Sequence, residues 1–122
     1  MARKVTLFTG QWADLPFKKM CETAKDFGYD GLELCCWGDH IELDKASKSK
    51  SYCDDKRAVL AESGLGCWAI SNHLSGQLVC DNIDDRHYIF APAALKGDPK
   101  AAKKWAIEMQ KKAAKAAKNL GV

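Results

Sequence analysis

Apolar residues gather in three short runs along the chain, and a stretch with helical spacing follows each run. The runs cover residues 4–8, 31–37 and 67–71, and glycine or polar residues bound each of them. Short, continuous apolar runs of this kind predict strands that are covered on both faces. Strands that are joined by helices pair in parallel, because the connection must cross over the sheet. The pattern therefore predicts an α/β fold with three βα units in the order β-α-β-α-β-α.

The first helix is predicted to begin near Phe17. Asp14 and Pro16 stand just before it in a pattern typical of a helix start, so we expect Asp14 to serve as the cap. Gly28 is expected to end this helix. The positions on its buried face are expected to be Met20, Cys21, Ala24 and Phe27.

The middle of the chain contains one helix and two polar segments. Residues 38–51 are expected to form a polar excursion, and residues 52–63 a helix. Residues 72–97 are expected to be a long irregular segment, since no apolar periodicity stands out in them.

The last helix has clear start and stop signals. Asp98 is followed by Pro99, which fits a capping carboxylate and a proline in the first turn, and Gly121 marks the end. Apolar residues recur at spacings of three and four, which predicts one buried stripe, while lysines occupy the opposite face. The stripe consists of Ala102, Ala106, Met109, Ala113, Ala116 and Leu120.

The formal charge of +3 hides an uneven distribution. Residues 1–95 carry a net charge of −3, whereas residues 96–122 carry eight lysines against Asp98 and Glu108, a net charge of +6. Such a basic segment is typical of a solvated helix face. It also allows an alternative function, a small basic binding module that uses the lysine-rich helix to bind nucleic acid or an acidic partner.

The composition is that of a globular protein, with 47% hydrophobic and 29% charged residues over 122 positions. Only a short apolar run follows the basic start, so we expect neither a secretory signal nor a membrane span, and a cytoplasmic location. The six cysteines include no C-x-x-C pair, and Cys35 and Cys36 are adjacent. We therefore expect reduced thiols rather than disulfides or a cysteine zinc site.

Candidate chemistry lies directly after the predicted strands. Ligands of parallel α/β folds bind beyond the carboxyl ends of the strands, where aromatic, amide and imidazole groups here converge. Such groups are suited to binding a polyol or a sugar. The expected substrate-binding residues are Trp37, His40, Asn72, His73 and Gln77. Glu33, a carboxylate within an apolar strand, is either a site acid or, as we favour, paired inside the sheet.

Three segments together resemble the start of the sugar phosphate isomerase/epimerase family. They are residues 5–10, residues 28–40 with Gly-Tyr-Asp-Gly-Leu-Glu-Leu and Trp-Gly-Asp-His, and residues 67–73 with Cys-Trp-Ala-Ile-Ser-Asn-His. The resemblance extends over essentially the whole chain. It implies a xylose isomerase-like TIM barrel, in which residues 1–122 would form the N-terminal (βα)3 part.

The resemblance also implies an activity. Enzymes of this family move a proton beside a carbonyl in a sugar or sugar phosphate, with a divalent metal such as Mn, Mg, Zn or Co that polarises the substrate oxygens. The family's Glu/Asp/His/Glu metal ligands lie on later strands, so no metal is expected to bind this chain alone. His73 matches the histidine after the third strand, and Trp37 and His40 match the second-strand rim of the pocket.

A complete barrel has eight strands and about 250 residues, whereas this chain supplies three predicted strands. We therefore expect an N-terminal fragment of a metal-dependent sugar isomerase or epimerase that contributes part of the substrate rim and is inactive alone. Exposed strand edges would favour a homo-oligomer. Nucleic acid and membrane partners are not expected.

Overall fold

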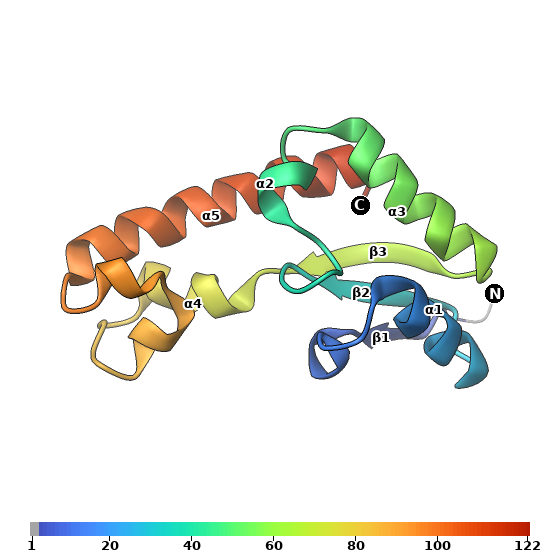
Figure 1. The fold of residues 1–122 in the computed structure, drawn as a ribbon, viewed down its shortest axis with the longest axis horizontal. Coiled ribbons are helices and arrows are strands. Elements are labelled where there is room, and N and C mark those ends of the chain that lie inside the picture. Colours follow the sequence, from blue (N-terminus) through green and yellow to red (C-terminus); the bar gives the residue numbers. More distant parts are fainter. Residues whose placement is uncertain (1–2) are drawn as a thin grey trace.

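The computed structural model describes residues 3–122 and has three parallel strands in one sheet (Figure 1). The strands are β1 (Thr6–Phe8), β2 (Gly31–Cys35) and β3 (Gly66–Ser71). β2 lies in the centre and pairs in parallel with β1 and with β3. The prediction of an α/β fold with three parallel βα units is confirmed.

Helices follow each strand. The helices are α1 (Phe17–Asp26), α2 (Leu43–Ala46), α3 (Lys50–Glu62), α4 (His73–Cys80) and α5 (Pro99–Leu120), with short 3-10 turns η1 (Gly10–Trp12), η2 (His87–Phe90) and η3 (Ala93–Leu95). Among the described residues, no helix is long and apolar enough to cross a membrane.

The main core lies between the sheet and the helices. Leu32 and Leu34 of β2 are fully buried and belong to one cluster with apolar residues of α1, α2, α3 and the C-terminal part of α5. Because side chains alternate along a strand, Glu33 lies on the other face of β2. The helices therefore bury one face of the sheet and leave the other face open.

The open face carries an exposed tryptophan. A bulge between β2 and β3 shifts their register after Leu32, and Trp68 lies at this point of β3 with 52% of its surface exposed. Its ring covers Gly31 and Gly66, where any Cβ would collide with it. Glu33 is half-buried, and its carboxylate makes no hydrogen bond or ion pair with residues 3–122, so the predicted pairing of this carboxylate within the sheet is not observed.

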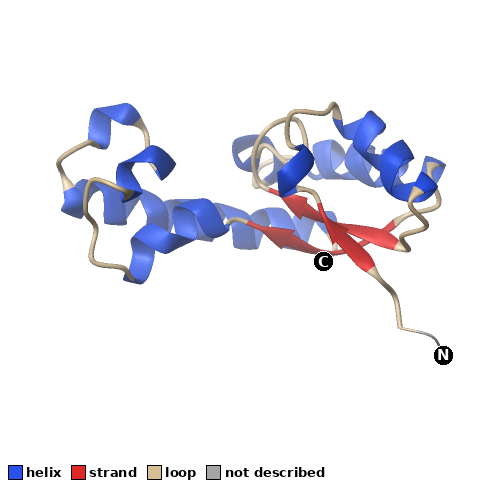
Figure 2. Cartoon of the chain, turned by 90° about the horizontal axis from the view of Figure 1, so that it is seen from below, coloured by secondary structure: helices blue, strands red, loops and turns tan. Residues whose placement is uncertain are grey.

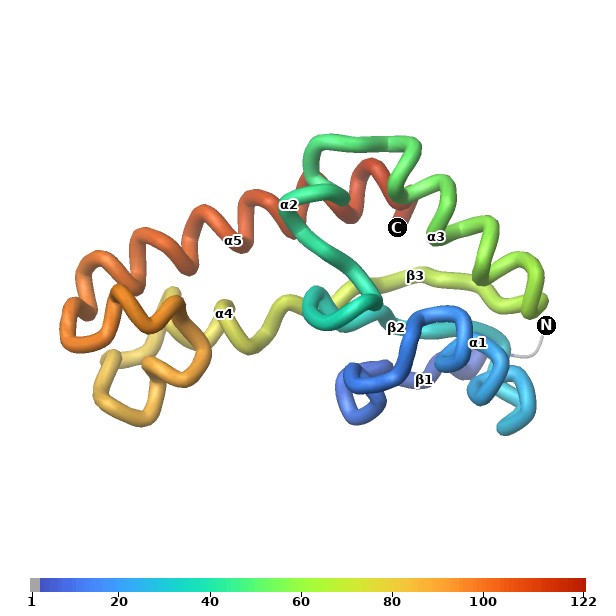
Figure 3. Tube along the Cα trace, viewed as in Figure 1, coloured from blue at the N-terminus to red at the C-terminus, as the bar shows by residue number. Residues whose placement is uncertain are grey.

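A second, smaller cluster forms a lobe that contains no strand (Figure 2). Leu78 of α4 packs there against Ala102 and Ala106 in the first half of α5, with Trp105 at the side. Figure 3 shows that β3 leads directly into α4, so the chain passes from the sheet into this lobe without a long linker. α5 then spans both clusters.

The start of α1 differs from the prediction. Asp14 is exposed and makes no capping hydrogen bond, and Pro16 occupies the cap position. The Phe17 N–H instead donates to Oδ2 of Asp39 at 2.8 Å. This bond holds the pKa of Asp39 below its usual range. The cap of α1 therefore comes from a loop 22 residues further along the chain.

Two helices were not predicted. α2 lies inside the expected polar excursion and α4 inside the expected irregular segment. Both are short, and each has few buried residues: Leu43 and Ala46 in α2, and Ser75 and Leu78 in α4. Phe27 was expected to be buried but is 60% exposed, because it follows the last turn of α1 at the C-cap.

The prediction for the last helix is confirmed. The Asp98 carboxylate accepts a hydrogen bond from the Ala101 N–H at 2.9 Å, and Gly121 ends the helix in the left-handed conformation with φ of 82°. The C-terminal end is held by Arg57 of α3, whose guanidinium donates to the carbonyls of Asn119 and Leu120. α5 is therefore fixed to the sheet side of the molecule at this end.

Candidate functional site

Three aromatic rings meet at the carboxyl ends of the strands. Trp37 follows β2, His73 follows β3, and Phe8 is the last residue of β1. The ring centroids of Trp37 and His73 lie 5.3 Å apart, those of Phe8 and His73 5.6 Å, and those of Phe8 and Trp37 6.0 Å. Gly10 permits this arrangement, because a Cβ there would collide with the Phe8 ring and lie 3.0 Å from Trp37.

His73 is the exposed imidazole of this cluster. Its Nδ1 lies 2.8 Å from the Ser71 hydroxyl, which fixes the orientation of the ring. No residue among 3–122 forms a hydrogen bond with its Nε2. The second ring nitrogen is thus available to a ligand.

Asn72 stands at the N-cap of α4 but does not cap it with its side chain. Its Nδ2 is buried and has no hydrogen-bond partner. Its backbone carbonyl is satisfied, since it accepts from Nε2 of Gln110 at 3.2 Å. A buried amide nitrogen without a partner costs about 1–3 kcal/mol, which a ligand oxygen or a water molecule would recover.

Asn72 and Trp37 also line a cavity of about 210 Å³ between the strand ends and the helical lobe. The walls come from the segment that follows β2, from α4 with its N-cap, and from η2 and α5, and they are mostly apolar. The lining residues are Cys36, Trp37, Asn72, Leu74, Ser75, Ile89, Phe90, Trp105 and Met109. Trp105 of α5 packs in the second cluster and forms part of this wall.

Gln77 follows His73 by four residues in α4, so it lies one turn further on the same side of the helix. It is partly exposed and has no side-chain hydrogen bond within the described residues. We call Phe8, Trp37, Asn72, His73 and Gln77 the strand-end rim. Four of the five predicted binding residues belong to it.

His40 does not belong to the rim. It is fully buried, and both ring nitrogens contact protein atoms: Nδ1 lies 2.8 Å from the Thr9 hydroxyl and Nε2 3.2 Å from the Leu15 carbonyl. A carbonyl only accepts, so Nε2 carries the proton and Nδ1 accepts from Thr9. Burial lowers the pKa of His40 and favours the neutral ring. The structure therefore gives His40 a structural place in the core, which corrects its expected role at the rim.

His40 and Thr9 also tie the first two strand ends together. The Cys35 N–H donates to the Thr9 hydroxyl at 3.0 Å, and the Cys35 thiol lies 3.3 Å from Nδ1 of His40. This buried network fixes the loop after β1 against the end of β2. It thereby supports the positions of Phe8 and Trp37 without contacting a ligand itself.

The resemblance implies a divalent metal, which needs a group of carboxylate, imidazole or thiolate ligands. Within residues 3–122, no three His, Cys, Asp or Glu side chains lie together as a metal-binding group. His73 is near a hydroxyl and aromatic rings rather than carboxylates. The described residues do not fit a complete metal site.

The sequence was also compared with known proteins. No family model matches the chain, and neither does any curated protein.

Phe8, Ile89 and Phe90 belong to the site but were not predicted from the sequence as site residues. Phe8 was assigned to a buried strand, and nothing in the sequence indicates that the last ring of a strand turns toward the rim. Ile89 and Phe90 lie in a segment that was expected to be irregular. Phe90 packs in the second cluster, which brings this segment to the cavity wall.

Proposed function

We propose that this chain forms part of the sugar-binding rim of a metal-dependent sugar or sugar phosphate isomerase or epimerase, and that it is inactive alone. The observation that carries the proposal is the meeting of Trp37, His73 and Phe8 beside the unpartnered amide of Asn72. The sequence resemblance described above supports the same function.

The groups at the rim suit a polyol ligand. Aromatic faces pack against the C–H faces of a sugar ring, while amides and imidazoles bind its hydroxyls. Nδ2 of Asn72 would donate to a ligand oxygen, and Nε2 of His73 would donate or accept according to its tautomer. These residues would bind and orient a substrate. The family's metal ligands, which the resemblance places on later strands, would supply polarisation of the substrate oxygens.

Sugar binding can be measured by NMR titration of the ¹⁵N-labelled chain with xylose, fructose and fructose 6-phosphate. We expect weak, saturable shifts at the Trp37 indole and the Asn72 and Gln77 side-chain amides. Trp37→Ala should abolish them. Trp68→Ala is the matched control, because Trp68 covers Gly31 and Gly66 at the other ends of the strands. Equal effects of the two variants, or no saturable shifts, would contradict the proposed binding site.

Catalysis is tested separately. The isolated chain is incubated with ketoses, aldoses and sugar phosphates in the presence of Mn²⁺ or Mg²⁺, and products are followed by chromatography. We expect no turnover. Robust turnover by the chain alone would overturn the claim that it needs further residues for catalysis.

We also propose that the chain associates with a second copy of itself and that it is located in the cytoplasm. In the described residues β1 and β3 each pair with one neighbour only, which leaves two edges for a second copy of this chain. All six cysteines are free thiols, which supports a reducing compartment and hence the cytoplasm.

A further inference from the structure

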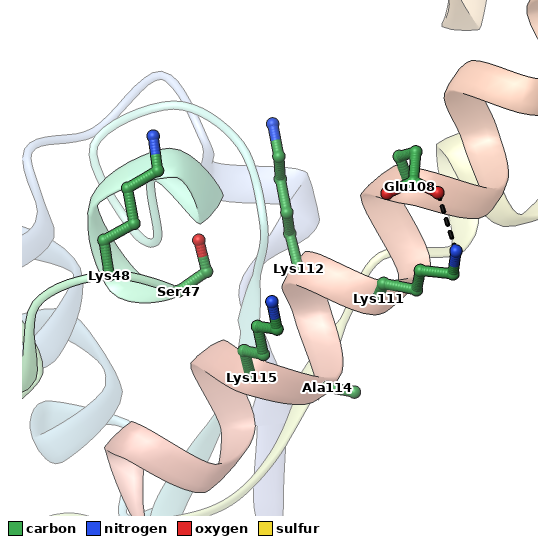
Figure 4. Close-up of a pocket in the computed structure, with 7 residues that line it drawn as sticks. All are labelled: Ser47, Lys48, Glu108, Lys111, Lys112, Ala114 and Lys115. Atoms are coloured by element: carbon green, nitrogen blue, oxygen red, sulfur yellow. Dashed lines mark hydrogen bonds and ion pairs between the residues drawn. The ribbon is translucent and has the colours of Figure 1, made fainter.

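A larger hollow lies away from the strand ends, between the C-terminal end of α2 and the middle of α5 (Figure 4). Its volume is about 460 Å³, and it shares no residue with the strand-end rim. Four of the lining residues are lysines. The full lining consists of Ser47, Lys48, Glu108, Lys111, Lys112, Ala114 and Lys115.

Two of the four lysines have a carboxylate partner. Nζ of Lys111 lies 2.7 Å from Glu108, and Nζ of Lys112 lies 2.6 Å from Asp44. Lys48 and Lys115 form no ion pair with any residue among 3–122. With these two carboxylates counted, the hollow retains two uncompensated positive charges.

The positive charges come together from distant parts of the sequence. Figure 4 shows Lys48 on one wall, Lys112 and Lys115 on the other, and the Ser47 hydroxyl between them, while Lys111 turns toward Glu108. Lysines on an ordinary solvated helix face point apart into water. Here the packing of α2 on α5 places Lys48 opposite Lys112 and Lys115 around one concavity, where a small anion would be attracted by several positive charges at once.

We infer that this hollow binds a small anion that carries a phosphate or pyrophosphate group. Its volume is within the range of small-molecule sites. Lysine ammonium groups bind phosphate as point charges, and the Ser47 hydroxyl adds a neutral donor. A dianion would match the two uncompensated charges. The inference is independent of the proposed function, because no rim residue takes part.

Inorganic pyrophosphate is the probe for the test, titrated into the ¹⁵N-labelled chain at low salt and at 150 mM salt. We expect saturable shifts at the Ser47 and Lys48 backbone amides. In Lys48→Gln/Lys115→Gln, the loss of two exposed charge contacts should raise the dissociation constant about tenfold. Both lysines are exposed, so the fold of this variant is expected to persist, which its circular dichroism would check.

Lys100→Gln/Lys104→Gln is the matched control. Both lysines lie on exposed positions of the first half of α5, outside the hollow, and the variant has the same net charge as the test variant. Its affinity for pyrophosphate should stay within twofold of the unmodified chain. Equal weakening in both variants, or shifts that do not saturate, would overturn the inference.

A duplex DNA titration completes the design. If DNA binds and both double variants weaken it equally, the lysine face of α5 acts as a general polyanion surface, and the confined site is contradicted. Pyrophosphate binding that depends on Lys48 and Lys115, without comparable DNA binding, supports the hollow as the site.

Discussion

His40 illustrates how one residue can serve the fold rather than the ligand. Its neutral ring is fully buried and donates from Nε2 to Leu15 while Nδ1 accepts from Thr9. Burial lowers its pKa from the usual value of 6.5. The unfolded chain therefore binds a proton more readily than the folded chain does, and acid favours unfolding.

This linkage predicts a pH dependence of stability. The contribution of His40 is fully present above pH 6.5 and is lost as the pH falls from that value through the folded pKa. Urea unfolding between pH 7.5 and 5 should show the decline. His40→Asn should lower the unfolding free energy at pH 7.5 by about 2–4 kcal/mol and flatten the decline. Equal slopes in both proteins would contradict this account.

The cysteines lead to a second prediction at the residue scale. Burial raises the pKa of Cys21 and Cys36 to about 12 and that of Cys67 to about 11, so these thiols hardly ionise near neutral pH. Cys80 is the exposed thiol among the six. A maleimide reagent at pH 7.5 should modify Cys80 rapidly and the others only after urea is added, as followed by mass spectrometry. Cys80→Ser should remove the rapid step, and fast labelling that remains in this variant would count against the described packing.

At the scale of elements, the start of α1 tests which carboxylate acts as the cap. Asp39→Ala removes the acceptor of the Phe17 N–H and should lower the unfolding free energy by about 1 kcal/mol. Asp14 is the cap that the sequence indicated. Asp14→Ala should change the unfolding free energy by less than about 0.5 kcal/mol. Urea denaturation of the two variants shows which carboxylate caps α1. A larger loss of stability in Asp14→Ala than in Asp39→Ala would show that Asp14 is the cap.

The elements differ in how well the sequence predicted them. α5 has its cap, its proline and its terminal glycine within the helix sequence itself, so its bounds were found from local signals. α2 and α4 have weak local signals and are held by contact with α5. The cap of α1 arrives from another loop, and no pattern near Asp14 shows this.

At the scale of the molecule, the helices cover one face of the sheet and leave the other face and two strand edges open. The proposed second copy would cover this surface. Light scattering at micromolar concentration should give about twice the chain mass of 13.5 kDa. Trp68→Lys, which places a charge on the open face, should shift the protein toward the monomer. A well-folded monomer of the unmodified chain would refute the proposed self-association.

The candidate site was predicted in part. Trp37, Asn72, His73 and Gln77 were expected at the strand ends because parallel strands bring their carboxyl ends to one edge; the structure places Trp37, Asn72 and His73 there and Gln77 one turn further along α4. The sequence could not separate them from His40, which follows the same strand as Trp37. Whether a polar residue after a strand faces solvent or the core depends on the packing of the neighbouring loops.

The sequence by itself determined the parallel βα order, the buried stripe of α5 and the position of Trp37, Asn72 and His73 directly after the strands. Those features rest on periodicity and on local backbone preferences, which neighbouring residues carry. Only the tertiary structure decided that Asp39 caps α1, that His40 is buried, that Asn72 has an unpartnered nitrogen and that Lys48 and Lys115 line one hollow. Each of these features requires contacts between segments that are distant in the chain. The free energy of such contacts depends on how the helices and strands pack, which neighbouring residues do not determine.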